Sequence, residues 1–243
     1  MFESSGISLF KGDWREGIKQ IPDFSVNLIY TDPPYNMHII KPGERNGNND
    51  LISAYEGLDV VQANEFDVVE FCEAVWPKMK RANIYIWCAK RQVVEYMNFF
   101  VNEKRLNYDL LFWLKTNAPP TFSNKYLSDV EYCLYFHESG LVHPRSYDDA
   151  RTAYVSPLSQ SQRSVGHPTV KPLEFVKSHI LNSSNEKDVV FDPFMGSGTT
   201  GVACKELGRK FIGCEINDNF FELAKNRIDG KAYAKPSILN SLF

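Results

Sequence analysis

Short apolar runs alternate along the chain with longer stretches in which apolar residues recur at helical spacing. Such runs predict strands, and the 3.6-residue spacing predicts amphipathic helices. The predicted strands are Val26–Tyr30, Asn83–Trp87, Asp109–Leu114, Val130–Phe136, Val189–Phe191 and Lys210–Cys214. The predicted helices are Trp14–Gln20, Glu65–Met79, Gln92–Glu103, Pro172–Leu181, Thr199–Leu207 and Asn217–Asp229. This alternation predicts an α/β fold with a mostly parallel, doubly wound sheet and helices on both faces.

Two segments interrupt the alternation. Residues 36–64 are rich in glycine and asparagine, and residues 137–166 are polar with scattered arginines and tyrosines. Long irregular segments inside a compact domain are usually functional loops or linkers. We therefore interpret residues 1–243 as one domain with a loop insertion at 36–64 and a small surface segment at 137–166. For the insertion, function and plain disorder are equally open.

Composition narrows the class of protein. The 243 residues are 43% hydrophobic and 23% charged, which is typical of a soluble globular protein. We find no signal-peptide pattern and no apolar run of membrane-spanning length, so we expect a cytoplasmic protein without a membrane partner. The five cysteines form no C-x-x-C pair and the five histidines have no metal-ligand spacing, which predicts buried thiols and no metal site.

The stretch Tyr-Thr-Asp-Pro-Pro-Tyr-Asn-Met follows the first predicted strand. Each proline lacks an N–H and fixes φ, so Pro33 and Pro34 cannot lie within a central strand or a helix. The chain stiffens where it leaves the strand, with Asp32 before the prolines and Tyr35 after them. Alone, this pattern fits either a rigid turn or part of a functional site.

A second informative stretch covers residues 189–217, where a strand ends at Asp192 and a glycine turn leads into a helix. Glu215 ends the next predicted strand, where an acid can accept hydrogen bonds from a ribose diol. Gly196, Gly198 and Gly201 have the G-x-G-x-x-G spacing, so a dinucleotide and S-adenosylmethionine both remain open. A nucleoside triphosphate is disfavoured because no lysine follows the final glycine as in a P-loop.

The two stretches together are more specific than either one. Asp-Pro-Pro-Tyr followed by Asp-Pro-Phe-Met-Gly-Ser-Gly-Thr-Thr resembles the β-class amino-methyltransferases of DNA, in which the catalytic motif precedes the cofactor motif. The resemblance covers nearly the whole chain apart from the two irregular segments and the tail. It implies a circularly permuted Rossmann-like methyltransferase fold, S-adenosylmethionine as cofactor and double-stranded DNA as substrate.

The resemblance also implies roles for individual residues. Asp13 would bind the adenine amino group of the cofactor, and Thr169 with Lys171, in His-Pro-Thr-Val-Lys-Pro, would hold its methionine carboxylate. Trp113 and Lys115, in Trp-Leu-Lys-Thr-Asn, would border the target-base pocket. The remaining cofactor-binding residues would be Asp32, Asp192, Phe194, Gly196, Ser197, Gly198, Thr199 and Glu215.

The chemistry of amine methylation suits the first motif. An exocyclic amine is a poor nucleophile because its lone pair is delocalised into the base. The Asp32 carboxylate and the Pro33 carbonyl, held by the stiff Pro33–Pro34 pair, would accept both N–H groups and favour the nucleophilic geometry. The base must be flipped out of the duplex, and Tyr35 would stack on it. Within the family, an aspartate at the start of this motif favours N6-adenine, and N4-cytosine is the alternative.

Target recognition is assigned to residues 137–166, where Arg145, Arg151 and Arg163 would contact phosphates or guanines. Because this segment is short, a short target or a homodimer that shares recognition is a reasonable hypothesis.

A methyltransferase acting on RNA or on a protein amide remains a rival with the same fold. A dinucleotide-dependent oxidoreductase is the rival from another class, although it leaves Asp32 and Tyr35 unexplained. A non-catalytic DNA-binding module is the last alternative.

Overall fold

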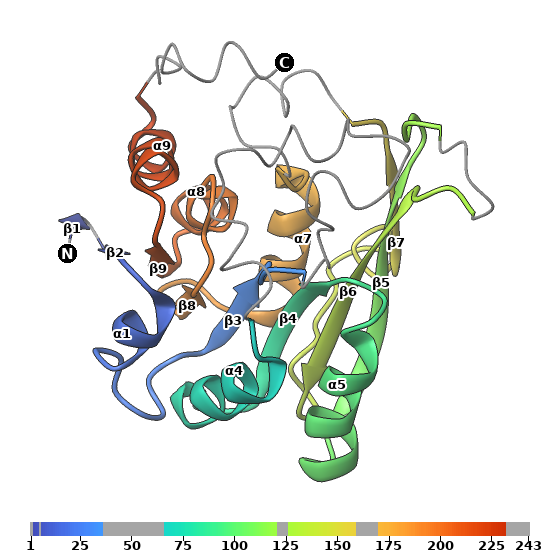
Figure 1. The fold of residues 1–243 in the computed structure, drawn as a ribbon, viewed down its shortest axis with the longest axis horizontal. Coiled ribbons are helices and arrows are strands. Elements are labelled where there is room, and N and C mark those ends of the chain that lie inside the picture. Colours follow the sequence, from blue (N-terminus) through green and yellow to red (C-terminus); the bar gives the residue numbers. More distant parts are fainter. Residues whose placement is uncertain (1, 5, 36–65, 121–125, 159–169, 232–243) are drawn as a thin grey trace, which may run out of the picture.

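The computed structural model describes residues 2–4, 6–35, 66–120, 126–158 and 170–231. Within these ranges, nine strands form one sheet in the order β1-β2-β9-β8-β3-β4-β6-β5-β7 (Figure 1). The strands are β1 (Phe2–Ser4), β2 (Ile7–Lys11), β3 (Leu28–Thr31), β4 (Asn83–Cys88), β5 (Asn107–Lys115), β6 (Val130–His137), β7 (Ala153–Ser156), β8 (Val189–Asp192) and β9 (Lys210–Glu215). Strands β2, β9, β8, β3 and β4 are parallel neighbours, whereas β1 and β6 are antiparallel to the strands beside them.

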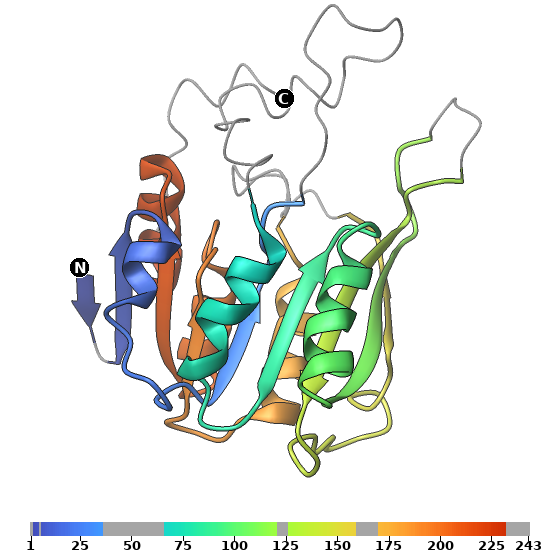
Figure 2. The same ribbon diagram turned by 60° about the horizontal axis from the view of Figure 1, so that its bottom comes forward.

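Six α-helices of the described chain cover the two faces of this sheet. They are α1 (Trp14–Ile18), α4 (Val68–Val75), α5 (Val93–Met97), α7 (Leu173–Ser183), α8 (Thr199–Glu206) and α9 (Asp218–Asp229). A 3-10 turn (Trp76–Lys78) extends α4, and a π-helical segment (Asn98–Glu103) extends α5. Helices α1, α4 and α5 pack on one face, and α7, α8 and α9 pack on the other (Figure 2).

The central strands have almost continuous apolar sequences because both faces of the sheet are covered. In β3, Ile29 packs with the α1, α4 and α5 layer, whereas Leu28 and Tyr30 pack with the α7, α8 and α9 layer. This alternation follows from the period of two residues along a strand. All four residues of β3 and all six of β4 are buried, so these strands form the centre of the molecule.

The α/β fold predicted from the sequence is confirmed, with boundaries that differ by a few residues. The structure adds strands that the apolar pattern did not indicate: β1, β2 and β7. Strand β7 lies inside residues 137–166, so part of the predicted surface segment is an edge strand paired in parallel with β5. The insertion at 36–64 lies outside the described residues.

Two further expectations concern burial and membrane crossing. All five cysteines are buried, as predicted: Cys72, Cys88, Cys133, Cys204 and Cys214. In the described ranges, no helix has both the length and the apolar character needed to cross a bilayer.

Candidate active site

The carboxyl ends of neighbouring parallel strands bring the two sequence motifs together. Strand β3 pairs directly with β8, although the chain places their motifs far apart. Asp32 follows β3, Asp192 ends β8 and Glu215 ends β9, so the three carboxylates lie along one edge of the sheet. Ligands of open α/β sheets bind at this edge.

The Asp-Pro-Pro-Tyr turn is held in place by a residue in the segment between β4 and α5. Gln92, which precedes α5, donates a hydrogen bond of 2.9 Å from Nε2 to the carbonyl oxygen of Pro34. Its Oε1 accepts a hydrogen bond of 3.0 Å from the amide of Ala89, and only 1% of the residue is exposed. The Gln92 side chain therefore fixes the turn that carries Asp32 and Tyr35.

Asp32 is engaged through one carboxylate oxygen. Lys171 Nζ lies 2.5 Å from Asp32 Oδ2 and 3.3 Å from the hydroxyl of Tyr35. The other oxygen, Oδ1, is buried and has no hydrogen-bond partner among the described residues. Burial raises the pKa of Asp32 above its usual value, and the ammonium of Lys171 opposes this rise. Asp32 thus presents one fixed and one unpaired acceptor.

Lys171 belongs to a longer chain of alternating charges. Its Nζ lies 3.0 Å from Glu131 Oε2, and Glu131 Oε1 lies 2.8 Å from Lys115 Nζ. Burial alone would lower the pKa of Lys171, but the carboxylates of Asp32 and Glu131 outweigh it and raise that pKa. Burial opposes the charge of Glu131 as well, yet the two lysines lower the pKa of its carboxyl group below its usual value. Lys171 and Glu131 are therefore held in their charged forms by their neighbours.

The glycine turn after β8 is built around Glu215. The Gly196 amide donates to Glu215 Oε2 at 3.0 Å, and the Asn217 amide donates to Oε1 at 2.7 Å. Gly198 has φ of +79°, and a Cβ at this position would lie 2.8 Å from Ala224 Cβ in α9. Both the left-handed backbone and the contact with α9 therefore require glycine here.

Asp192 is the most enclosed carboxylate of this edge, with 3% of the residue exposed. It accepts hydrogen bonds of 2.7 Å from the Thr200 hydroxyl and 3.1 Å from the Phe194 amide. Burial raises the pKa of Asp192 to about 7. Arg227 of α9 supports the same turn, because its Nη1 donates to the Ser197 carbonyl at 2.5 Å.

Asp13 occupies the start of α1 beside this turn. Its Oδ1 caps the helix by accepting a hydrogen bond of 2.7 Å from the Arg15 amide. The preceding Gly12 amide donates to the Glu215 carbonyl at 2.9 Å, which ties the end of β2 to the end of β9. Phe194 packs against Trp14, with ring centroids 5.8 Å apart.

The residues predicted to contact DNA are not all brought to this edge. Trp113 is only 1% exposed, lies in the core and donates to the Ser156 hydroxyl at 2.9 Å, which leaves it no open face for a base. Lys115 pairs with Glu131 at the edge of the sheet that carries Asp32. Arg151 is exposed in the turn before β7, 3.7 Å from Asp148. Thr169 and Arg163 lie outside the described residues.

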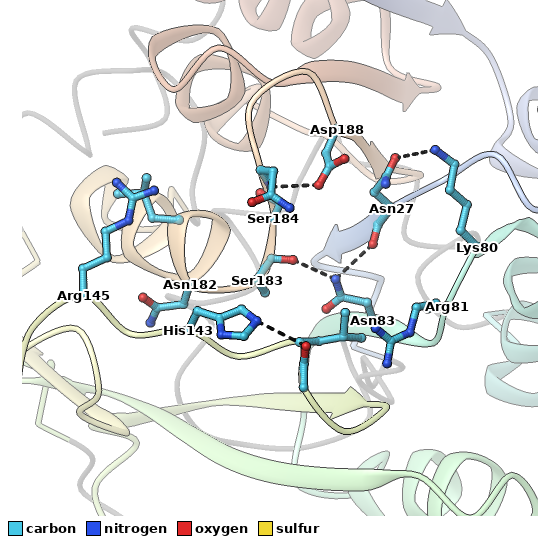
Figure 3. A pocket seen from close by; sticks show the side chains of 14 residues that line it. Asn27, Lys80, Arg81, Asn83, His143, Arg145, Asn182, Ser183, Ser184 and Asp188 are labelled. Carbon is cyan, nitrogen blue, oxygen red and sulfur yellow. Dashed lines mark hydrogen bonds between the residues drawn. The ribbon is translucent and has the colours of Figure 1, made fainter.

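Arg145 lies at the opposite edge of the sheet. It lines a polar pocket of about 440 Å³ together with residues that precede β3, β4 and β8 (Figure 3). Asn27 and Asn83 both line this pocket, and Asn83 Nδ2 donates a hydrogen bond of 2.9 Å to the Asn27 carbonyl. Because parallel strands begin at this edge, the predicted DNA contact of Arg145 is separated from Asp32 by the length of β3.

Sequence reasoning missed Gln92, Glu131 and Arg227. The sequence pattern places Gln92 only at the start of a helix and Glu131 only in a strand. A charged residue inside an otherwise apolar strand, as at Glu131, was the available signal, because burying an unpaired carboxylate is costly. No local pattern pointed to the contacts of Gln92 and Arg227.

Comparison with known proteins identifies the class defined by this fold and site. The model of the N6/N4 DNA methylase family matches residues 26–226. The chain therefore belongs to this family of DNA methylases.

Individual relatives agree with that assignment. The chain is 29% identical to the type II methyltransferase M.HinfI of Haemophilus influenzae, over 91% of this chain and 68% of that protein. It is also 29% identical to the type II methyltransferase M2.MboI of Moraxella bovis, over 93% and 89%. The solved structure of an M1.HpyAVI–SAM complex superposes with a TM-score of 0.66 and 27% identity, covering 91% of this chain and 99% of that one.

The cofactor is S-adenosylmethionine, as the family match and the relative solved as a SAM complex support. The residues of the site fit this molecule, which carries a sulfonium, an ammonium and a ribose diol but no phosphate. Asp192 and Glu215 both contact the glycine turn, where they accept hydrogen bonds from the amides of Phe194 and Gly196. The family match overturns the dinucleotide alternative, which the glycine spacing alone leaves open.

Proposed function

We propose that this chain is a site-specific DNA methyltransferase that methylates the exocyclic N6 of adenine. The proposal rests on one observation about Asp32. Its Oδ1 is buried and has no hydrogen-bond partner among the described residues, and it lies beside the glycine turn that follows β8. A buried acceptor without a donor is costly unless a ligand supplies one. An exocyclic amine of a substrate base is such a donor.

The proposed chemistry follows from the two acceptors of the turn. Asp32 Oδ1 accepts one N–H of the amine and the Pro33 carbonyl accepts the other, while Gln92 occupies the Pro34 carbonyl and so fixes the direction of the turn. These bonds favour a pyramidal nitrogen whose lone pair can attack, and they stabilise the positive charge that develops there. When bound, S-adenosylmethionine supplies the methyl group as a sulfonium.

Tyr35 is proposed to stack on the flipped base. Its hydroxyl contacts Lys171 at 3.3 Å, which orients the ring next to Asp32. A base inside a duplex cannot reach Asp32, so the target nucleotide must leave the stack. Double-stranded DNA is therefore the proposed substrate.

Adenine is preferred to cytosine because the motif begins with Asp32, the form that favours adenine within the family. The cytosine-N4-specific PvuII DNA methyltransferase superposes with a TM-score of 0.71 and covers 98% of this chain, but at 15% identity it supports the fold alone. A role beside a restriction enzyme is suggested by the type II relatives. Action in the cytoplasm and a homodimer remain predictions of the sequence.

The test is to incubate the purified chain with unmethylated duplex DNA and S-adenosylmethionine, then analyse the nucleosides by mass spectrometry. We expect N6-methyldeoxyadenosine, and none with the Asp32→Ala variant. The appearance of N4-methyldeoxycytidine instead would overturn the choice of base. Single-stranded RNA and a protein acceptor are included in parallel, and preferential methylation of either would overturn DNA as the substrate.

A further inference from the structure

Glu131 lies at the same edge of the sheet as Asp32, although it belongs to neither sequence motif. It is near the start of β6, which runs antiparallel to β4, and it pairs in register with Trp113 of β5. Its side chain is 16% exposed and its two oxygens face different lysines, Lys171 at 3.0 Å and Lys115 at 2.8 Å. The position of the Glu131 carboxylate is therefore fixed by two cations.

We propose that Glu131 is a positioning residue that holds Lys171 between two carboxylates and thereby tunes how strongly Asp32 accepts a proton or an N–H group. This inference rests on the proposed role of Asp32 in amine methylation. Lys171 acts on Asp32 by direct contact, and Glu131 acts only through Lys171.

The geometry explains why Glu131 matters to Asp32. An ammonium that faces a single buried carboxylate strongly stabilises the negative charge of that carboxylate. The carboxylate is then a weaker acceptor of a proton or an N–H group. Here the same ammonium is shared, because Asp32 Oδ2 and Glu131 Oε2 lie 2.5 and 3.0 Å from Lys171 Nζ. The negative charge of Glu131 also acts on Asp32 directly and favours its protonated form. Asp32 is thus a stronger base than an isolated pair with Lys171 would allow.

Lys115 completes the arrangement. It balances the second oxygen of Glu131, so that Glu131 stays ionised while it shares Lys171. Without Lys115, two carboxylates would share one ammonium, and the net negative charge would favour protonation of one of them. With Lys115 in place, Glu131 can share Lys171 while Asp32 can still act as an acceptor.

Other titratable groups face Asp32 from the surrounding elements. Burial raises the pKa values of the tyrosines and cysteines among them, which are therefore neutral near pH 7: Tyr30, Tyr35, Tyr96, Cys88 and Cys133. Asp192 on β8 has a pKa of about 7 and also interacts with Asp32. Lys171 and Glu131 remain the fully charged groups that act on Asp32.

The experiment measures the ionisation of Asp32 directly in the protein without cofactor or DNA. The side-chain carboxyl carbons of aspartate are labelled with ¹³C and followed by NMR as a function of pH, and Asp32→Asn assigns the Asp32 signal. With Glu131→Gln we expect the Asp32 midpoint to fall by about one pH unit. With Lys171→Met we expect it to rise by about one unit or more, because the ammonium is lost.

Glu138→Gln is the matched control, since Glu138 also pairs with a cation, Arg81 at 3.0 Å, but at the opposite edge of the sheet. It should leave the Asp32 midpoint unchanged. If Glu131→Gln does not fold, Glu131→Asp, whose carboxylate is withdrawn from Lys171, should give a smaller fall. An Asp32 midpoint that stays in place or rises in the folded Glu131 variant overturns the proposal.

A second readout separates tuning from cofactor binding. Glu131→Gln should lower kcat about tenfold, because a weaker base accepts less effectively, and leave KM for S-adenosylmethionine unchanged. A rise in KM with constant kcat would instead place Lys171 and Glu131 at the methionine carboxylate. Because the NMR titration needs no turnover, it gives its answer even if the chain methylates another acceptor.

Discussion

The amide group of Gln92 and the carbonyl oxygen of Pro34 are joined by a partly buried hydrogen bond of 2.9 Å that spans 58 residues of sequence. Two prolines make the turn stiff but do not choose its direction. Gln92 supplies the direction, because it is anchored at the start of α5 by its second hydrogen bond, to the Ala89 amide.

Replacing Gln92 should therefore impair catalysis more than folding. We expect Gln92→Leu to lower the rate of methyl transfer by roughly 10- to 100-fold, because a small misplacement of the acceptors is costly. Stability should fall by about 1–2 kcal/mol for the lost hydrogen bonds. Steady-state kinetics and urea unfolding check the two effects. Asn102→Leu, which removes an exposed amide bonded to Asn98, is the control, and equal rates in both variants would refute the role of Gln92.

Gly198 should tolerate no side chain. Gly198→Ala forces a left-handed backbone on alanine and brings its Cβ 2.9 Å from the Ala224 Cα. We expect a loss of about 3 kcal/mol in the free energy of unfolding, together with loss of cofactor binding. Gly140→Ala is the matched control: Gly140 has φ of +75° but open space around it, so only about 1 kcal/mol should be lost. Chemical denaturation measures both, and equal losses would contradict the contact with α9.

The buried carboxyl of Asp192 predicts an unusual dependence of stability on pH. Its pKa of about 7 in the folded chain lies above the usual value of 3.8. Between pH 4 and pH 7 the unfolded state has lost this proton and the folded state retains it, so the contribution of Asp192 to stability falls as pH rises. The full loss is about 4 kcal/mol and is complete above pH 7.

Asp192→Asn removes this titration and can keep the bonds to Thr200 and Phe194. We expect the variant to gain stability over the parent at pH 8 and to match it more closely at pH 5. Denaturant unfolding at the two pH values gives the comparison. An unchanged difference between pH 5 and pH 8 would mean that Asp192 titrates normally.

Arg227 should affect cofactor affinity without touching the acceptors of the amine. Arg227→Met removes the donor to the Ser197 carbonyl while it keeps most of the apolar stem. We expect the Kd of S-adenosylmethionine to rise about tenfold, in line with the loss of one charged hydrogen bond. Calorimetry measures the affinity. Arg81→Met, at the opposite edge, should bind the cofactor as the parent does, and a similar Kd in Arg227→Met would exclude the role.

The sequence predicted the parts of the molecule whose causes are local. Strands β3 and β4 are buried on both faces, so their apolar runs were readable, and the prolines and glycines marked the two turns of the site. Strand β7 was missed because its four residues sit at the sheet edge, within a polar segment.

Contacts across the fold could not be predicted in the same way. The contact of Lys171 with Asp32, 139 residues away, did not follow from the sequence, and a role of Lys171 at the methionine carboxylate stays a prediction. The contacts of Gln92 and Glu131 likewise depend on which strands become neighbours. Spacing along the chain carries no information about that neighbourhood, and only the folded sheet reveals it.

The pairing of β3 with β8 has a consequence for how the protein is made. Asn27, just before β3, accepts a hydrogen bond from the Val189 amide, 162 positions later. At the usual pace of translation, roughly 10 to 30 s separate the synthesis of these partners. During that interval the strand that carries the Asp-Pro-Pro-Tyr turn lacks one neighbour. A growing chain therefore brings its acceptor turn and its glycine turn together only after β8 has been made, so a nascent chain that stops before β8 lacks the paired site.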